Sequence, residues 1–223
     1  GRGWTVYDSP AGPVALGHRR LAIIDVSDAG LQPMSDPTGA CHLVFNGEIY
    51  NHAELREELK AKGERFVSQS DSEVLLRAYM VWGEACLPKL RGMFAFVIWD
   101  ERNKRLVAAR DRFGVKPLYV AGDALTGGTR IAFASEIKQL IGLPGVSTRA
   151  NIARVHDFLA SGISDHTAET LFQDVMQLRG GECVTVDAAS ARPEARIERW
   201  YPVGARELRL SEREAAQRFH DLL

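Results

Sequence analysis

Two apolar segments separated by a short polar stretch constrain the fold more than any other feature of this sequence. The longest uninterrupted apolar run extends from Met93 to Trp99, four polar residues follow at 101–104, and a second run lies within 105–110. Segments of this length and spacing predict two β-strands joined by a turn. Because both runs are nearly continuous, both faces of these strands are expected to be buried.

Further strands and helices are predicted on either side of this pair. Strands are expected at 14–17, 21–24, 42–45, 65–68, 118–121, 131–134, 182–186 and 196–201. Helices are expected after Asn51, with Glu54 completing a cap, after Ser70, over 136–141 and 151–159, and from Ser211 onwards. Many strands with segregated helices predict an α+β layered domain rather than alternating β-α units.

Composition excludes several classes of protein. The 223 residues suffice for one sizeable domain plus an appendage, and 45% hydrophobic with 26% charged residues excludes a disordered, collagen-like or coiled-coil chain. Lys and Arg number 28 against 29 Asp and Glu, so nucleic acid is not an expected partner. No apolar run approaches the length of a membrane span and no signal peptide opens the chain, so no membrane partner and a cytoplasmic location are expected.

The three cysteines predict neither a disulfide framework nor a metal site. Cys41, Cys86 and Cys183 are far apart, and their number is odd. Reduced thiols that pack as small buried hydrophobes are the simplest interpretation, and no metal is expected in this chain.

Five residues have the chemistry of a receptor for a free amino acid. The guanidinium of Arg20 suits a carboxylate, and the acids Glu48 and Asp71 suit an ammonium group. The Asn46 side chain and the Gly47 N–H suit an oxyanion that develops during acyl transfer. Each residue also has a structural interpretation: Asn-Gly after a strand is typical of a type I′ turn, Asp71 of the first turn of a helix, and Arg20 and Glu48 of a solvated surface.

Several longer strings favour the functional interpretation. Residues 45–51 read FNGEIYN, and the others are LGHRRLAIID at 16–25, QPM at 32–34, SDSE at 70–73, GMFAF at 92–96, RDRFGVKPLY at 110–119 and ASEIK at 134–138. Together they resemble, in order and over residues 14–201, class II glutamine amidotransferase domains, specifically those of glutamine-hydrolysing asparagine synthetases.

This resemblance implies an N-terminal-nucleophile hydrolase fold, a four-layer αββα sandwich of two antiparallel sheets, here lacking its first strand. It implies that Arg20 binds the glutamine carboxylate, that Asn46 and Gly47 form the oxyanion hole, and that Glu48 and Asp71 hold the ammonium group. Backbone groups of Leu21, Ala22, Ile23 and Ile24 are expected to line the same pocket. An N-terminal cysteine, activated by its own α-amine, is the nucleophile in such domains.

The chain is expected to be a fragment of a longer enzyme. It begins with Gly1 and lacks the nucleophile motif, so it is expected to be inactive alone. Residues 1–201 are expected to form the amidotransferase domain, and 202–223 a linker with the first helix of a synthetase domain. That second domain would use ATP and Mg²⁺ to make a β-aspartyl-adenylate and amidate aspartate, whereas no cofactor is expected in the present chain. Glutamine and the synthetase domain are the expected partners, and a homodimer is left open.

Three alternatives stay open from the sequence alone. An amidotransferase could deliver ammonia to another acceptor, such as a carboxylated sugar. A protein without the nucleophile could bind glutamine as a sensor, and a domain of this fold could serve only structure or interaction.

Overall fold

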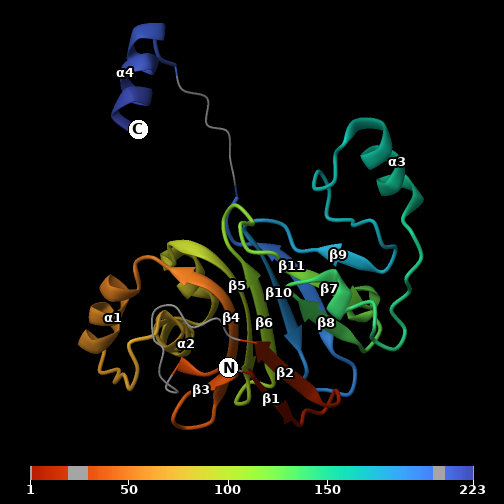
Figure 1. The fold of residues 1–223 in the computed structure, drawn as a ribbon. Helices are drawn as coiled ribbons and strands as arrows, with labels where there is room; N and C mark the ends of the chain where they lie inside the picture. Colours follow the sequence, from red (N-terminus) through yellow and green to blue (C-terminus); the bar gives the residue numbers. More distant parts are fainter. Residues whose placement is uncertain (1, 20–29, 203–208, 223) are drawn as a thin grey trace.

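A six-stranded antiparallel sheet forms the centre of the computed structural model, which describes residues 2–19, 30–202 and 209–222 (Figure 1). Its strand order is β11-β10-β6-β5-β4-β3. The strands are β3 (Met34–Ser35), β4 (Cys41–Ile49), β5 (Gly92–Asp100), β6 (Arg105–Arg110), β10 (Glu182–Asp187) and β11 (Glu194–Arg199). The predicted central pair is confirmed: β5 and β6 form a hairpin, and residues 94–100 are all buried.

Two smaller antiparallel sheets lie on one side of the central sheet (Figure 1). In the first, β1 (Arg2–Tyr7) pairs with β2 (Val14–Arg19). In the second, β7 (Tyr119–Gly122) lies between β8 (Ile131–Ala134) and β9 (Val175–Gln177). The predicted combination of antiparallel sheets and segregated helices is therefore confirmed.

Helices α1 (His52–Ala61) and α2 (Asp71–Trp82) cover the other face of the central sheet, followed by the 3₁₀ helix η2 (Gly83–Lys89). Alternation along each strand separates the two faces. In β5, Phe94, Phe96 and Ile98 pack with the helices, whereas Ala95 and Val97 pack toward the smaller sheets. Burial on both faces explains why β5 is apolar at almost every position.

The outer side of the β7-β8-β9 sheet is covered by short elements. The 3₁₀ helix η4 (Ile137–Gln139) lies in this region, and Leu140 packs with Ala121 and Val175. The 3₁₀ helix η3 (Ala124–Thr126) instead lies near β11, and its Leu125 packs in the core between the sheets. Helix α3 (Ile152–Ser161) follows, and none of its residues is buried. Helix α4 (Glu212–Leu222) also has no buried residue; the Ser211 and Glu214 cap predicted for its start is present.

Three local predictions are wrong. Residues 65–68 do not form a strand, because the backbone N–H groups of Val67 and Ser68 bind the Glu73 carboxylate instead of a neighbouring strand. The helix expected at 136–141 is reduced to η4. Asn51 precedes α1 without a side-chain cap, because its amide bonds with Lys89 C=O and Arg91 N–H across the chain.

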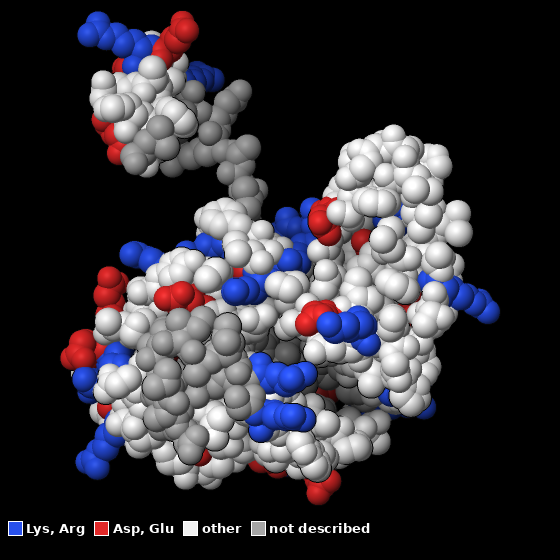
Figure 2. Space-filling model, in the orientation of Figure 1, with Lys and Arg blue, Asp and Glu red and all other residues white. Residues whose placement is uncertain are grey.

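The charged residues form a mixed surface. On the face drawn in Figure 2, basic and acidic side chains are interspersed, as expected for a net charge of −1. None of the helices in the described part of the chain combines the length and the hydropathy needed to span a membrane.

Candidate functional site

Strand β4 carries Asn46, Gly47 and Glu48 along a cleft between the central sheet and the smaller sheets. The cleft has a volume of about 2020 Å³, and all three residues line it. The side chains of Phe45 and Ile49 point into the opposite, helix-covered core. Alternation therefore directs the Asn46 and Glu48 side chains toward the cleft. The type I′ turn is excluded at Asn46 and Gly47, because both residues pair with β5 inside the strand.

Gly47 occupies a position that other residues cannot take. Its φ of 151° is strongly disfavoured for residues with a side chain, and a Cβ atom would lie 2.1 Å from the Met93 carbonyl oxygen. Gly92, which pairs with Ile49, has the same restriction: its Cβ would lie 2.1 Å from the Glu48 carbonyl oxygen. The two glycines permit a close approach of β4 and β5 beside the cleft.

The outer edge of β4 presents a short row of backbone N–H groups. Tyr50 N–H donates to Arg91 C=O on the β5 side, at 2.7 Å, so the odd-numbered residues of β4 direct their N–H groups to the opposite edge. On that edge Phe45 N–H donates to Gln32 Oε1 at 2.6 Å, and Ile49 N–H donates to Asp71 Oδ2 at 3.0 Å. The N–H of Gly47 lies between these two groups and faces the same edge.

The Asn46 amide is held from the second sheet. Its Nδ2 donates to Ser135 Oγ at 3.4 Å, and Ser135 directly follows β8. The amide donor and the Gly47 N–H therefore come from consecutive residues of one strand and lie beside the same cleft. N–H donors of both kinds can stabilise negative charge on an oxygen atom.

Asp71 brings a carboxylate to the same place from α2. It is the first residue of the helix and is 5% exposed, and burial raises the pKa of its carboxyl above the usual value. Ser70 caps the helix by accepting the N–H of Ser72 at 3.0 Å. The guanidinium of Arg56 donates to the carbonyl oxygens of Ser68 and Ser70 and so fixes the segment before the helix.

The structure therefore brings four of the predicted site residues to one cleft: Asn46, Gly47, Glu48 and Asp71. The remaining predicted residues, Arg20, Leu21, Ala22, Ile23 and Ile24, lie outside the described residues. Gln32, Ser72 and Ser135 also line the cleft and were not predicted as site residues. All three belong to the strings that carry the family resemblance, which was the available signal.

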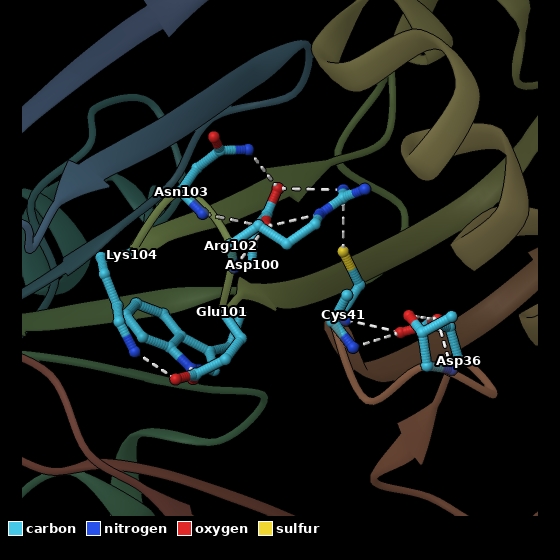
Figure 3. Close-up of polar contacts among 10 residues, drawn as sticks. Asp36, Cys41, Asp100, Glu101, Arg102, Asn103 and Lys104 are labelled. Atoms are coloured by element: carbon cyan, nitrogen blue, oxygen red, sulfur yellow. Dashed lines mark hydrogen bonds and ion pairs between the residues drawn. The ribbon is translucent and has the colours of Figure 1, made fainter.

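The cysteines of this chain lie outside the cleft. Cys41, Cys86 and Cys183 are buried, and burial raises the pKa values of their thiols to about 12, 12 and 11. Figure 3 shows the surroundings of Cys41, whose Sγ is 3.3 Å from an Arg102 nitrogen. Arg102 also pairs with the buried Asp100, which organises the β5–β6 turn. These thiols are structural and remain protonated near neutral pH.

No metal centre is evident among the described residues. Within residues 2–19, 30–202 and 209–222, no group of three or more His, Cys, Asp and Glu side chains is arranged to hold a metal ion. The cleft instead offers N–H donors, an amide and carboxylates, which suit a small polar molecule with both charges.

Comparisons with known proteins agree with this geometry. The glutamine amidotransferase domain family matches residues 5–201. Asparagine synthetase [glutamine-hydrolyzing] 3 of Bacillus subtilis is 37% identical over 174 residues, which are 77% of this chain and 28% of that protein. Amidase chry2 of Gibberella zeae is 38% identical over 168 residues, 75% of this chain and 24% of the amidase.

The fold is shared with a solved amidotransferase. Glutamine phosphoribosylpyrophosphate amidotransferase from B. subtilis matches with a TM-score of 0.55 and 22% identity, over 85% of this chain and 35% of the other. The present chain spans about a quarter of the length of the two sequence relatives, the asparagine synthetase and the amidase. The family match covers nearly the whole of the sandwich, and this chain belongs to the glutamine amidotransferase domain family, with the antiparallel sandwich of the N-terminal-nucleophile hydrolases.

Proposed function

We propose that this domain hydrolyses L-glutamine to L-glutamate and ammonia, as the glutaminase half of an asparagine synthetase. The observation that carries the proposal is the row of backbone N–H groups on the edge of β4 that faces away from β5. There the Gly47 N–H and the Asn46 amide lie beside the cleft, between two anchored N–H groups, with Glu48 and Asp71 nearby. This arrangement suits an amino acid whose side-chain amide carbon is attacked.

Each residue has a role in the proposed reaction. Glu48 and Asp71 bind the α-ammonium group of glutamine, and Arg20 binds its α-carboxylate. The Asn46 amide and the Gly47 N–H stabilise the tetrahedral oxyanion, whose charge exceeds that of the ground-state carbonyl. The interaction therefore strengthens as the transition state is reached, so these two donors act mainly on kcat.

The nucleophile in this proposal is an N-terminal cysteine of the complete polypeptide, upstream of Gly1. Its thiolate attacks the amide carbon and its α-amine takes up the thiol proton, which then leaves with the ammonia. Water hydrolyses the thioester, releases glutamate and restores the thiol. Cys41, Cys86 and Cys183 are buried outside the cleft, so the chain of 223 residues is expected to bind glutamine without hydrolysing it.

The ammonia acceptor lies outside this chain. We propose aspartate, activated as a β-aspartyl-adenylate by a second domain that uses ATP and Mg²⁺; the relatives named asparagine synthetases support this choice. A relative of similar identity is named an amidase and not a synthetase. The alternative proposal is an acceptor other than aspartate, such as a carboxylated sugar.

The test uses the complete protein that carries this domain. Release of glutamate from glutamine, together with asparagine formed from aspartate, ATP and Mg²⁺, is the expected result. Glutamate release without asparagine would overturn the aspartate assignment only. Binding of glutamine without hydrolysis would indicate a glutamine sensor, and the absence of both binding and hydrolysis would contradict the proposal as a whole.

A further inference from the structure

A buried glutamine connects the two halves of the candidate site. Gln32 is 6% exposed, its Oε1 accepts Phe45 N–H at 2.6 Å, and its Nε2 donates to Ser72 Oγ at 3.3 Å. Phe45 precedes Asn46 in β4, and Ser72 follows Asp71 in α2. We propose that Gln32 is a positioning residue that holds the oxyanion donors and the Asp71 carboxylate in one geometry; the inference rests on the proposed glutamine hydrolysis.

The carboxamide of Gln32 takes the place of a neighbouring strand. The short β3 pairs with β4 only at Leu43 and His42. Phe45 is the next residue of β4 after Leu43 whose N–H points to this edge, and it has no partner in β3. An amide side chain offers an acceptor and a donor like those of a peptide group. Gln32 thereby continues the hydrogen bonding of β4 up to the residue before Asn46.

A second side chain holds the same peptide segment from β2. Nε2 of His18 donates to the Phe45 carbonyl oxygen at 3.0 Å. The N–H and the C=O of Phe45 are therefore both fixed by side chains, although none of the described strands pairs with β4 on this side at Phe45. Since the Asn46 side chain starts from the next Cα atom, its direction depends on these bonds.

The other arm of Gln32 reaches the ammonium side of the site. Ser72 is 5% exposed and belongs to the first turn of α2, directly after Asp71. Ile49, two residues beyond Gly47, donates its N–H to Asp71 Oδ2 and so links β4 to the start of α2 a second time. Displacing Gln32 would let β4 and the start of α2 shift relative to each other. Catalytic groups must keep their productive geometry to within about 0.5 Å, so a small shift is costly.

Replacement by methionine removes both bonds at nearly constant volume. In the complete protein, Gln32→Met is expected to lower kcat for glutamine hydrolysis at least about tenfold and to raise KM several-fold. Gln177→Met is the matched control. Gln177 is 9% exposed in β9, and its side chain bonds with Thr167 C=O at 2.8 Å and with Arg110 at 3.4 Å. The control should lower the melting temperature and leave kcat and KM unchanged.

Two further variants test the hydrogen bonds of Gln32 to Phe45 and to Ser72 one at a time. They also keep the proposal testable if Gln32→Met does not fold. Gln32→Glu keeps an acceptor for Phe45 N–H and is expected to retain more of kcat than Gln32→Met. Ser72→Ala removes only the bond on the α2 side, so KM should rise several-fold at unchanged kcat. An unchanged KM in Ser72→Ala would contradict the role of this arm.

Hydrogen exchange gives a readout that does not need activity. Measured by mass spectrometry, the segment 43–49 should exchange faster in Gln32→Met than in the wild type or in Gln177→Met. The wild type could fail to hydrolyse glutamine while the segment 43–49 still exchanges faster in Gln32→Met. That result would contradict the proposed function and support the role of Gln32 in positioning β4. If the wild type were active and Gln32→Met kept its kcat, KM and exchange, the role of Gln32 would be overturned.

Discussion

Asn46 is the residue at which a structural and a functional role separate most clearly. Asn46→Ala removes one donor to the developing oxyanion, so kcat for glutamine hydrolysis is expected to fall by about 10²–10³ with little change in KM. Asn103→Ala is a suitable control, because it removes a hydrogen bond to Asp100 at the β5–β6 turn, 2.8 Å long, away from the cleft. A change confined to KM in Asn46→Ala would contradict its place in the oxyanion hole.

Burial of the Asp71 carboxylate at the candidate ligand site lowers the stability of the fold near neutral pH. Burial raises the folded pKa of Asp71 above its usual value, so protonation is easier in the folded than in the unfolded state. The contribution of Asp71 to stability is therefore present at low pH and is lost as the pH rises from the unfolded pKa through the raised folded value.

The variant Asp71→Asn allows the effects of this charge on stability and on glutamine binding to be measured separately. The amide oxygen can still accept Ile49 N–H, but no charge is buried, so the melting temperature at neutral pH should equal or exceed that of the wild type. This advantage should shrink on acidification. Glutamine binding, followed by calorimetry, should weaken at least about tenfold because the ammonium group loses a carboxylate. Unchanged glutamine binding would remove Asp71 from the site.

The sequence led to these residues unevenly. Glu48, Asp71, the Asn46 amide and the Gly47 N–H were predicted as site residues because their chemistry suits a free amino acid and because they lie in strings that resemble the amidotransferase family. Their roles stay predictions. Gln32 and Ser135 form hydrogen bonds with Phe45 and Asn46, and these contacts depend on how a loop and a second sheet pack against β4. Hydrophobic periodicity and capping patterns do not predict this tertiary packing.

At the scale of elements, the pair β4–β5 depends on its glycines. Gly47→Ala combines a positive φ with a contact of 2.1 Å between Cβ and backbone, so we expect it to lower the free energy of unfolding by more than about 3 kcal/mol. Gly17→Ala in β2 is the control, because a Cβ there meets nothing within 4 Å. Urea unfolding should show at most about 1 kcal/mol of change in the control. Equal effects in the two variants would contradict this account.

The loop after β6 is organised by one carboxylate. Asp111 is 1% exposed and accepts four backbone N–H groups, from Phe94, Phe113, Val115 and Lys116, at 2.9–3.1 Å. Asp111→Ala leaves these donors unsatisfied and is expected to cost more than about 3 kcal/mol in unfolding free energy. Asp123→Ala, at an exposed loop, should lower the melting temperature far less. A comparable loss of stability in both variants would contradict the role of Asp111 in organising this loop.

Elements were predictable where an apolar run or a capping sequence marks them in the chain. The buried strands β5 and β6 were found from nearly continuous apolar runs, and the start of α2 was found from its capping sequence. The false strand at 65–68 has an apolar pattern too, but the buried Glu73 takes its N–H groups. A side chain five or six residues away decided the outcome, which strand propensity does not describe.

At the scale of the whole molecule, the end of the sandwich coincides with a cluster of aromatic residues. The Trp200 ring stacks on Phe94 with centroids 6.0 Å apart, and its Nε1 donates to Arg110 C=O at 3.2 Å. Trp200 thereby extends the core between the central sheet and the helices. Beyond it, the described residues 209–222 are all exposed.

This difference predicts where the chain can be shortened. Removing everything after Pro202 deletes α4, which buries no residue, so the melting temperature should stay within about 2 °C of that of the 223-residue chain. Ending the chain at Arg199 also removes Trp200. Loss of a packed aromatic ring costs about 3–5 kcal/mol when it is fully buried, and Trp200 is partly buried, so a smaller but clear destabilisation is expected. Thermal unfolding of the two shortened chains makes the comparison. A large loss already on removal of α4 would show that the helix packs on the sandwich, and would contradict a domain that ends near residue 201.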